Sequence, residues 1–477
     1  MKYPWQAIKK SALALWVGLV LSFFAAPALG GEVLWLNMVA ATSVENQSPF
    51  QIFTGGGWRA EKDAQFVKVH LYFDRDFDFS QMDVTTCSPL DQKKSIWAYL
   101  NFDGEFLFSD PDSDHSVSIK AKKPIPVHSV TLNFRSNSNL CIQSIQLKGR
   151  DGTPYDIRVP RFVSGGVNAS TTLKPAKAYN VMNLFDSRYE NAWSTDGQTT
   201  GGVLTFVFDQ PQSVQKLKIW NGYQRSDVHC IENSRVKTLH LEGDNGYTAD
   251  VPVLDVMGGQ EIPLPKPFTG KKLTLTITDG FKGKTYKDLV ITELRFFDGQ
   301  GWFMPDPTPQ ILAVAADNRQ SFRQAGMDDL LNQTLLREIR DAGDDEGELR
   351  LRPDGSFYLS NTIYGKYVEK EGGQRVAKQE GLGNYEVKST KDGRLELRLF
   401  GILRTTIQKG VTFDCNGCGR DCNQAKKGLG KSEKIFQEFI TLQKRVGGGD
   451  DSGPFEVGNT SGKHLKFKSY RASLYLK

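Results

Sequence analysis

Three cysteines near the C-terminal end of the chain have a spacing that could bind a metal ion or form disulfides. Cys415, Cys418 and Cys422 stand close together, and His464 follows later in the chain. Three thiolates and one imidazole would complete a tetrahedral zinc site. Structural zinc motifs usually contain two Cys-x-x-Cys pairs, however, and the spacing is not that of an iron–sulfur ferredoxin motif. The spacing therefore favours disulfides over zinc, provided that the chain reaches an oxidising compartment.

The N-terminal segment indicates which compartment that is. Lys9 and Lys10 close a short basic stretch, residues 12–26 form an apolar run, and small residues follow from Ala28. This order is typical of a secretory signal peptide. A retained membrane anchor is the alternative, but the run is shorter than the roughly 20 residues that a spanning helix needs. We therefore expect residues 1–30 to be removed and the mature chain to be secreted, periplasmic or at the cell surface.

In an exported chain, all six cysteines are expected to form disulfides. Cys87 and Cys141 lie within one proposed domain and could pair there. The simplest pairing of the other four joins two cysteines of the C-terminal group and links the third to Cys230. The sequence leaves this connectivity open.

Catalytic motifs are missing from the sequence. It contains no phosphate-binding loop, dinucleotide fingerprint, His-Glu-x-x-His or Gly-x-Ser-x-Gly motif. The adjacent Asp344 and Asp345 stand among glycine and charged residues, which is typical of a solvated turn. The 60 basic and 55 acidic residues are spread along the chain, which gives no reason to expect a nucleic-acid partner. We expect a protein that is not an enzyme.

Hydrophobic patterning divides the mature chain into three β-rich domains. Residues 31–160 show strands of period two, such as the one in which Val67 alternates with Lys68, and residues 161–303 contain a second series of strands. Short strands separated by turn residues predict β-sandwiches. Residues 304–310 contain three prolines and are expected to be a linker.

The last domain, residues 311–477, is predicted to be a small α+β domain. Its first element is expected to be a helix, because apolar residues recur at helical spacing at Met327, Leu330, Leu331, Leu335 and Ile339. Turn residues at 353–355 and 392–393 then predict two hairpins. A helix followed by an antiparallel meander suggests a small barrel, which could be lipocalin-like.

Several motifs in the second domain resemble those of one known family. They are residues 183–186 (NLFD) with 191–193 (NAW), residues 220–223 (WNGY) with 233–237 (NSRVK), and residues 279–288 (DGFKGKTYKD) leading into 291–294 (ITEL). This ordered set resembles the discoidin-like, galactose-binding-like glycan-binding domain first recognised beside a secreted bacterial NAD glycohydrolase. The resemblance implies a jelly-roll sandwich with binding loops at one end, and it does not imply NAD hydrolysis.

The resemblance also implies which residues could contact a glycan. Sugar recognition needs aromatic faces for stacking and amide or guanidinium groups for paired hydroxyls. The matching loops supply these groups at Tyr223, Arg225, Asn233, Arg235 and Tyr286. Arg235 could equally hold the loops together by paired hydrogen bonds. Trp193 is expected to lie in the core.

Many relatives of this sandwich hold a structural calcium ion, and the matching positions here are Asp186, Asn191 and Glu293. Calcium is bound by six to eight hard oxygen atoms. Arg188 stands where relatives often have a second acidic residue, and a cation there argues against the metal. The alternative is that Asp186 accepts hydrogen bonds from backbone amides and pairs with Arg188.

The first domain shows a similar strand order and a comparable entry at Phe50, Phe53 and Trp58. We interpret it as a diverged second sandwich that lacks the binding signatures. The leading hypothesis is thus an exported, lectin-like protein whose partner is a glycan or glycoconjugate. The alternatives are a secreted hydrolase with its chemistry in residues 310–477 and a structural envelope protein that binds other proteins.

Export should remove the N-terminal segment. Because the basic stretch, the apolar run and the small residues follow in that order, we expect a mature N-terminus between Gly30 and Glu32. Intact-mass measurement of the exported protein checks this expectation. Exported protein that retains residues 1–29 would contradict the secretory interpretation.

Overall fold

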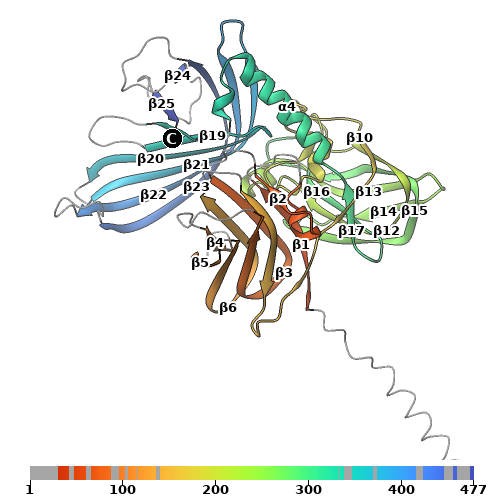
Figure 1. Cartoon of the computed structure of the whole chain (residues 1–477). Helices are drawn as coiled ribbons and strands as arrows, with labels where there is room; N and C mark the ends of the chain where they lie inside the picture. Colours follow the sequence, from red (N-terminus) through yellow and green to blue (C-terminus); the bar gives the residue numbers. More distant parts are fainter. Residues whose placement is uncertain are drawn as a thin grey trace, which may run out of the picture.

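The computed structural model describes residues 31–41, 48–60, 66–87, 96–101, 106–113, 115–135, 140–331, 334–337, 346–368, 373–414, 423–444, 455–458 and 473–476. These residues form three β-rich domains that pack against one another (Figure 1). The predicted signal peptide and the group Cys415, Cys418 and Cys422 lie outside the described residues, as does His464. Cleavage of the signal peptide and the pairing of these three cysteines therefore stay predictions.

The first domain is a β-sandwich built from one strongly bent sheet. Its elements are β1 (Val33–Ala41), the short helix α2 (Gln51–Thr54), β2 (Trp58–Arg59), β3 (Phe66–Thr86), β4 (Ile96–Leu100), β5 (Phe106–Ser113), β6 (Ser116–Arg135), β7 (Cys141–Lys148) and β8 (Asp156–Arg158). The strand order is β2-β7-β3-β6-β4-β5, and β1 pairs with β3 and, in parallel, with β8.

The long strands β3 and β6 pair with each other on both sides of the bend in the sheet. Along β3 the side chains of Val67 and Val69 are buried and that of Lys68 is half-buried, which confirms the predicted alternation. The pairing of β3 with β6 shifts between Tyr72 and Phe77, and such a bulge bends the strands. Before the bend β3 also pairs with β1, and after it with β7, so the sheet wraps around its core.

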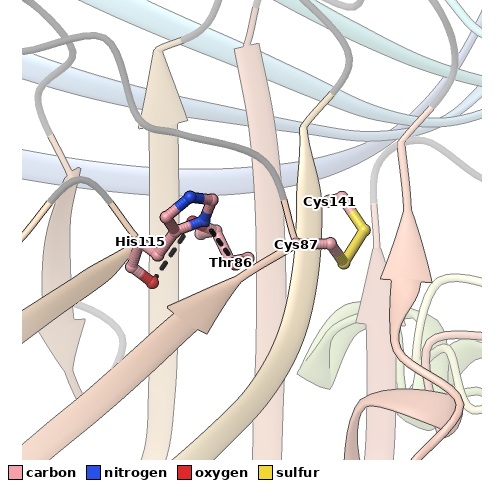
Figure 2. Close-up of a disulfide and its surroundings, with 4 residues drawn as sticks. All are labelled: Thr86, Cys87, His115 and Cys141. Carbon is pink, nitrogen blue, oxygen red and sulfur yellow. Dashed lines mark hydrogen bonds between the residues drawn. A yellow bond between two sulfur atoms is a disulfide. The ribbon is translucent and has the colours of Figure 1, made fainter.

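A disulfide joins Cys87 at the end of β3 to Cys141 at the start of β7, as predicted (Figure 2). Their Cα atoms are 5.3 Å apart, and the Cys87 amide donates to the Cys141 carbonyl at 3.1 Å. Cys230 has no disulfide partner among the described residues, and its expected bond to the C-terminal group stays a prediction because that group lies outside them. The Cys230 side chain is buried on a short helix of the second domain.

The second domain is a nine-stranded sandwich. Its elements are β9 (Arg161–Val163), β10 (Gly165–Ala169), η1 (Val181–Leu184), β11 (Trp193–Ser194), β12 (Val203–Asn221), α3 (Asp227–Glu232), β13 (Arg235–Gly243), β14 (Thr248–Pro252), β15 (Gly259–Phe281), β16 (Val290–Phe297) and β17 (Trp302–Pro305). The strand order is β14-β13-β15-β12-β16-β17-β9, with β10 on β12 and β11 on β16. Trp193 is fully buried, as expected, and the apolar core continues into that of the first domain.

The third domain is a closed barrel preceded by one helix. Its elements are α4 (Thr308–Gln324), η2 (Asp328–Leu330), β18 (Thr334–Arg337), β19 (Glu346–Leu351), β20 (Ser356–Val368), β21 (Gly373–Ser389), β22 (Leu395–Asp414), β23 (Asn423–Lys444), β24 (Phe455–Gly458) and β25 (Ser473–Leu476). Both predicted hairpins are present, with Gly355 and Gly393 at positive φ in their turns. Within the described residues, no helix combines the length and the apolar character needed to cross a membrane.

The position predicted for the helix is wrong. Leu335 lies in β18, where it pairs with Leu349 and Leu476, so barrel closure overrides the helical spacing of the apolar residues. The actual helix, α4, begins inside the segment expected to be a linker. Pro309 stands in its first turn, where a missing N–H removes no helical hydrogen bond.

The outward face of β3 packs against both other domains. The ammonium group of Lys68 lies 5.7 Å from the ring centre of Tyr358 in the barrel, and the ring of Tyr72 meets that of Tyr189 edge-on at 4.9 Å. Burial lowers the pKa of Lys68, and the nearby barrel arginines lower it further. The polar face of this strand is therefore an interface between domains.

Replacing both Cys87 and Cys141 with serine should lower the free energy of unfolding by about 2–4 kcal/mol, because the bond closes a long loop in the unfolded chain. Urea unfolding followed by tryptophan fluorescence measures this change. Wild type and double variant, both in dithiothreitol, serve as the control and should unfold at the same urea concentration, because the reductant removes every disulfide from both. Equal midpoints of the two proteins without dithiothreitol would show that the Cys87–Cys141 bond contributes little.

Candidate functional site

The loops at one end of the second domain carry the residues predicted to bind a glycan. After β12 the chain turns through Gly222, whose φ of +78° disfavours other residues and whose added Cβ would meet the Arg235 side chain at 2.8 Å. The buried Asn221 side chain bonds to the N–H and the carbonyl of Val236, both at 2.8 Å. The Asn-Gly pair thus fastens this loop to β13 and places Tyr223 at the end of the domain.

The helix α3 then positions Asn233. Ser226 caps its N-terminus by accepting a hydrogen bond from the His229 amide at 3.2 Å. At the other end, the Asn233 side chain donates to the His229 carbonyl at 2.8 Å. The local sequence therefore forms a single capped turn that presents Asn233 beside Tyr223.

A cavity of about 510 Å³ lies between this loop end and the barrel. Ligand pockets in proteins are commonly about 300–1,000 Å³ in volume. Four of the five residues predicted to contact a glycan line it, namely Tyr223, Arg225, Asn233 and Tyr286. The structure thus brings together side chains that are up to sixty-three positions apart (286 − 223) in the sequence.

These four residues differ in how far they are open to solvent. Tyr286 is 41% exposed, whereas Tyr223 is 3% exposed and its hydroxyl donates to the Glu190 carbonyl at 3.0 Å. Burial raises the pKa of Tyr223, although the Arg225 guanidinium, 4.6 Å from its ring centre, opposes this effect. Tyr223 therefore forms part of the cavity floor, and Tyr286 offers the accessible aromatic face.

Arg235 does not line the cavity. Its guanidinium forms an ion pair with Asp255, with nitrogen–oxygen distances of 2.5 and 2.9 Å, and it donates to the carbonyls of Cys230 and Asn233. These bonds hold α3 and the β14–β15 loop together. The structural role considered for Arg235 in the sequence therefore accounts for its contacts here.

The barrel supplies a wall of the cavity that the sequence did not predict. Phe400, Gln437 and Phe439 lie on β22 and β23 and line the cavity opposite the loops. The ring of Phe400 stacks on that of Tyr179 with 6.2 Å between centres. These residues have no local signal, because each follows the ordinary alternation of a strand and only domain packing brings it to the loops.

Beside the cavity, Arg188 joins all three domains. Its guanidinium donates to Asp354 of the barrel hairpin and, at 2.8 Å, to the Ala41 carbonyl of the first domain. Its backbone amide donates to Asp186 and Glu293, both at 3.0 Å. The ion-paired side chains of Arg188 and Asp354 are 11% and 13% exposed. We call this group of residues the three-domain junction.

The junction contains the positions predicted to bind calcium, but the oxygen atoms there are already used. Asp186 accepts from the Asn191 amide at 2.6 Å, and Glu293 accepts from Arg295 at 2.6 Å. Together with the two bonds from the Arg188 amide, every carboxylate oxygen of the pair has an N–H donor. Calcium requires six to eight oxygen ligands, and the charge of Glu293 is already paired with the Arg295 guanidinium. Asp186, Asn191 and Glu293 do meet, but the set fits a bonded carboxylate pair better than a calcium site.

Burial explains how two carboxylates can lie side by side at the junction. It raises the pKa of Asp186, and the neighbouring Glu293 raises it further. A raised pKa favours a shared proton over two adjacent negative charges. The alternative to calcium has two parts. Asp186 does accept a hydrogen bond from a backbone amide, but the Arg188 guanidinium pairs with Asp354 and not with Asp186.

Residues 162–297 match the family model of the NAD glycohydrolase translocation F5/8 type C domain. The second domain is a discoidin-like domain of this family. The match lies within the second domain and confirms the resemblance carried by its motifs. No curated protein matches the chain.

Solved structures similar to this chain include carbohydrate-binding modules. The CBM32-1 and CBM32-2 domains of Clostridium perfringens ZmpB in complex with GalNAc are 10% identical, with a TM-score of 0.23, over 55% of this chain and 90% of that chain. The family 32 module of C. perfringens NanJ in complex with galactose is 15% identical, with a TM-score of 0.22, over 27% and 90%. The family 32 module of Streptococcus pneumoniae EndoD is 15% identical, with a TM-score of 0.23, over 28% and 99%. TM-scores this low do not indicate a ligand for the discoidin-like domain.

Replacing Asp354 with asparagine should lower the free energy of unfolding by about 3–5 kcal/mol, because it leaves the buried Arg188 charge unpaired. Thermal unfolding of the full chain measures the change. Asp317→Asn is the matched control, since its ion pair with Lys177 also joins two domains but is more than half exposed, and it should have little effect. Equal effects of the two variants would contradict the role of the junction.

The same ion pair predicts a pH dependence. Burial alone would raise the pKa of Asp354, but Arg188 and Arg352 outweigh burial and lower the pKa to about 2. The stabilisation is therefore present above the ordinary carboxyl pKa near 3.8 and is lost as the pH falls towards 2. The difference in stability between wild type and Asp354→Asn should shrink over this range.

Proposed function

We propose that this chain is an exported protein that binds glycans at the loop end of its discoidin-like domain and has no catalytic activity of its own. The observation that carries the proposal is that Tyr223, Arg225, Asn233 and Tyr286 line one cavity of ligand size. Such a protein would act at the cell envelope or outside the cell.

The lining has the chemistry that sugar recognition needs. The exposed ring of Tyr286 can stack against the C–H face of a sugar. The side-chain amides of Asn233 and Gln437 supply donors and acceptors that suit hydroxyl groups. Since these groups come from two domains, a sugar could be held from two sides.

The charges in the cavity support binding rather than catalysis. Among the described residues that line it, Asp288 is the only carboxylate, whereas glycoside hydrolysis usually requires two. Burial, together with Arg225 and Arg404, lowers the pKa of His229 to about 2, which makes it a poor base near neutral pH.

Two observations support export. The order of residues at the N-terminus is that of a signal peptide, and the Cys87–Cys141 disulfide suits an oxidising compartment.

A glycan array probed with the full chain, followed by titration of the best ligand, tests the proposal. Tyr286→Ala should weaken binding about three- to tenfold, because the variant loses one stacking contact. Tyr99→Ala is the matched control, since Tyr99 is 36% exposed but lies in the first domain, and it should leave the affinity unchanged.

Three outcomes would contradict the proposal. The array could show no bound glycan, the two tyrosine variants could bind equally well, or the bound glycan could be converted into smaller products. The last outcome would favour the hydrolase alternative.

A further inference from the structure

The cavity between the discoidin-like domain and the barrel has an excess of positive charge. Among the described residues that line it, Lys174, Arg225 and Arg398 are cations and Asp288 is the single carboxylate. Arg398 is already paired with Glu386 at 2.9 Å, so its charge is largely neutralised. The excess therefore comes from Lys174 and Arg225.

Arg225 is the more informative of the two cations because it is 6% exposed. It donates from Nε to the Glu190 carbonyl at 2.7 Å and from Nη2 to the side-chain oxygen of Asn384. Both of these partners are neutral. A buried cation is costly unless an anion lies near it, so the charge of Arg225 favours an anionic group in the cavity.

Among the described residues, no carboxylate forms an ion pair with Arg225; the Glu190 carboxylate helps to raise the pKa of the adjacent Tyr223, but only the backbone carbonyl of Glu190 bonds to Arg225. His229 stays neutral, because burial and then the guanidinium groups of Arg225 and Arg404 lower its pKa. The Asp288 carboxylate accepts a hydrogen bond from the Gly197 amide at 2.6 Å, at the discoidin-like edge of the cavity. Lys174 is exposed and adds a second cation at the same cavity.

The cavity also has two accessible aromatic faces, one from each domain. Tyr286 of the discoidin-like domain is 41% exposed, and Phe439 on β23 is 46% exposed. Among the described residues, the exposed large aromatic side chains are Tyr99, Tyr286 and Phe439, and two of these three line this cavity. Exposed aromatic rings beside cations are suited to a ligand that has both an apolar face and a negative charge.

We propose that the ligand is an acidic glycan, with a sugar carboxylate beside Arg225 and Lys174 and sugar rings against Tyr286 and Phe439. This inference rests on the proposed glycan-binding function and adds two things to it. It names the class of sugar, and it makes the barrel part of the binding site.

Matched pairs of probes test the inference on the full chain by calorimetric titration. One pair is trigalacturonate and its fully methyl-esterified form, and the other is 3′-sialyllactose and lactose. At least one acidic probe should bind about tenfold or more tightly than its neutral partner, because a hydrogen bond to a charged group is worth about 1.5–3 kcal/mol. Raising the salt concentration from 50 to 500 mM should weaken the binding of the acidic probe and leave the binding of the neutral probe unchanged.

Variants locate the charge and the barrel wall. Arg225→Gln should abolish the preference for the acidic probe, but it could also disturb the contact with the barrel, so Lys174→Met is the second variant. Lys174→Met should weaken the binding of the acidic probe about two- to fivefold, as expected for the loss of an exposed ion pair. Lys282→Met, an exposed lysine that does not line the cavity, is the matched control. Phe439→Ala should weaken the binding of both the acidic probe and its neutral partner.

The outcomes separate this inference from the proposed function. If neutral glycans bind as tightly as acidic ones, or if Lys174→Met matches its control, the acidic ligand is excluded while glycan binding stands. If Phe439→Ala binds like wild type, the barrel is not part of the site. If neither the probes nor a glycan array shows binding, both proposals are wrong.

Discussion

The arrangement of the three domains depends on one buried guanidinium group. Arg188 belongs to the second domain, and its side chain bonds to Asp354 of the barrel and to the backbone of the first domain at Ala41. A buried charge needs hydrogen-bond partners in defined directions, whereas contact between apolar surfaces is not directional. Because these partners come from different domains, satisfying this one charge constrains the placement of all three.

The cavity between the discoidin-like domain and the barrel follows from that placement. Asn384 on β21 links the three-domain junction to the cavity, because its amide donates to Asn191 at 2.9 Å and its oxygen accepts from Arg225. One barrel side chain thus contacts a junction residue and a cavity residue at the same time. The barrel wall formed by Phe400 and its neighbours lies over the loops as a consequence, and the loop end is not a free surface as it would be in an isolated sandwich.

Sequence reasoning was most successful where the signal is local. The alternation of Val67 with Lys68 predicted a strand, and four of the five loop residues named from the family motifs line the cavity, Arg235 being the exception. It failed where distant parts of the chain decide the outcome. The apolar residues around Leu335 recur at helical spacing, and the pairing of Leu335 with the remote strands β19 and β25 overrides this local pattern. Asp354 was recognised as a turn residue, but the sequence around it does not predict its ion pair with Arg188, which lies 166 positions away.

The two ends of the discoidin-like domain lie side by side, since β9 and β17 pair in parallel with Arg161 beside Phe303. The chain therefore enters and leaves this domain at neighbouring points. Domains with adjacent ends can be inserted into, or removed from, a longer chain with little disturbance of what flanks them. This geometry suits a domain that is added to a chain, or removed from it, as one unit. In this chain the contacts of Arg188 with Asp354 and Ala41 tie the domain to both neighbours, so its removal would leave these two acceptors without the donor that they share.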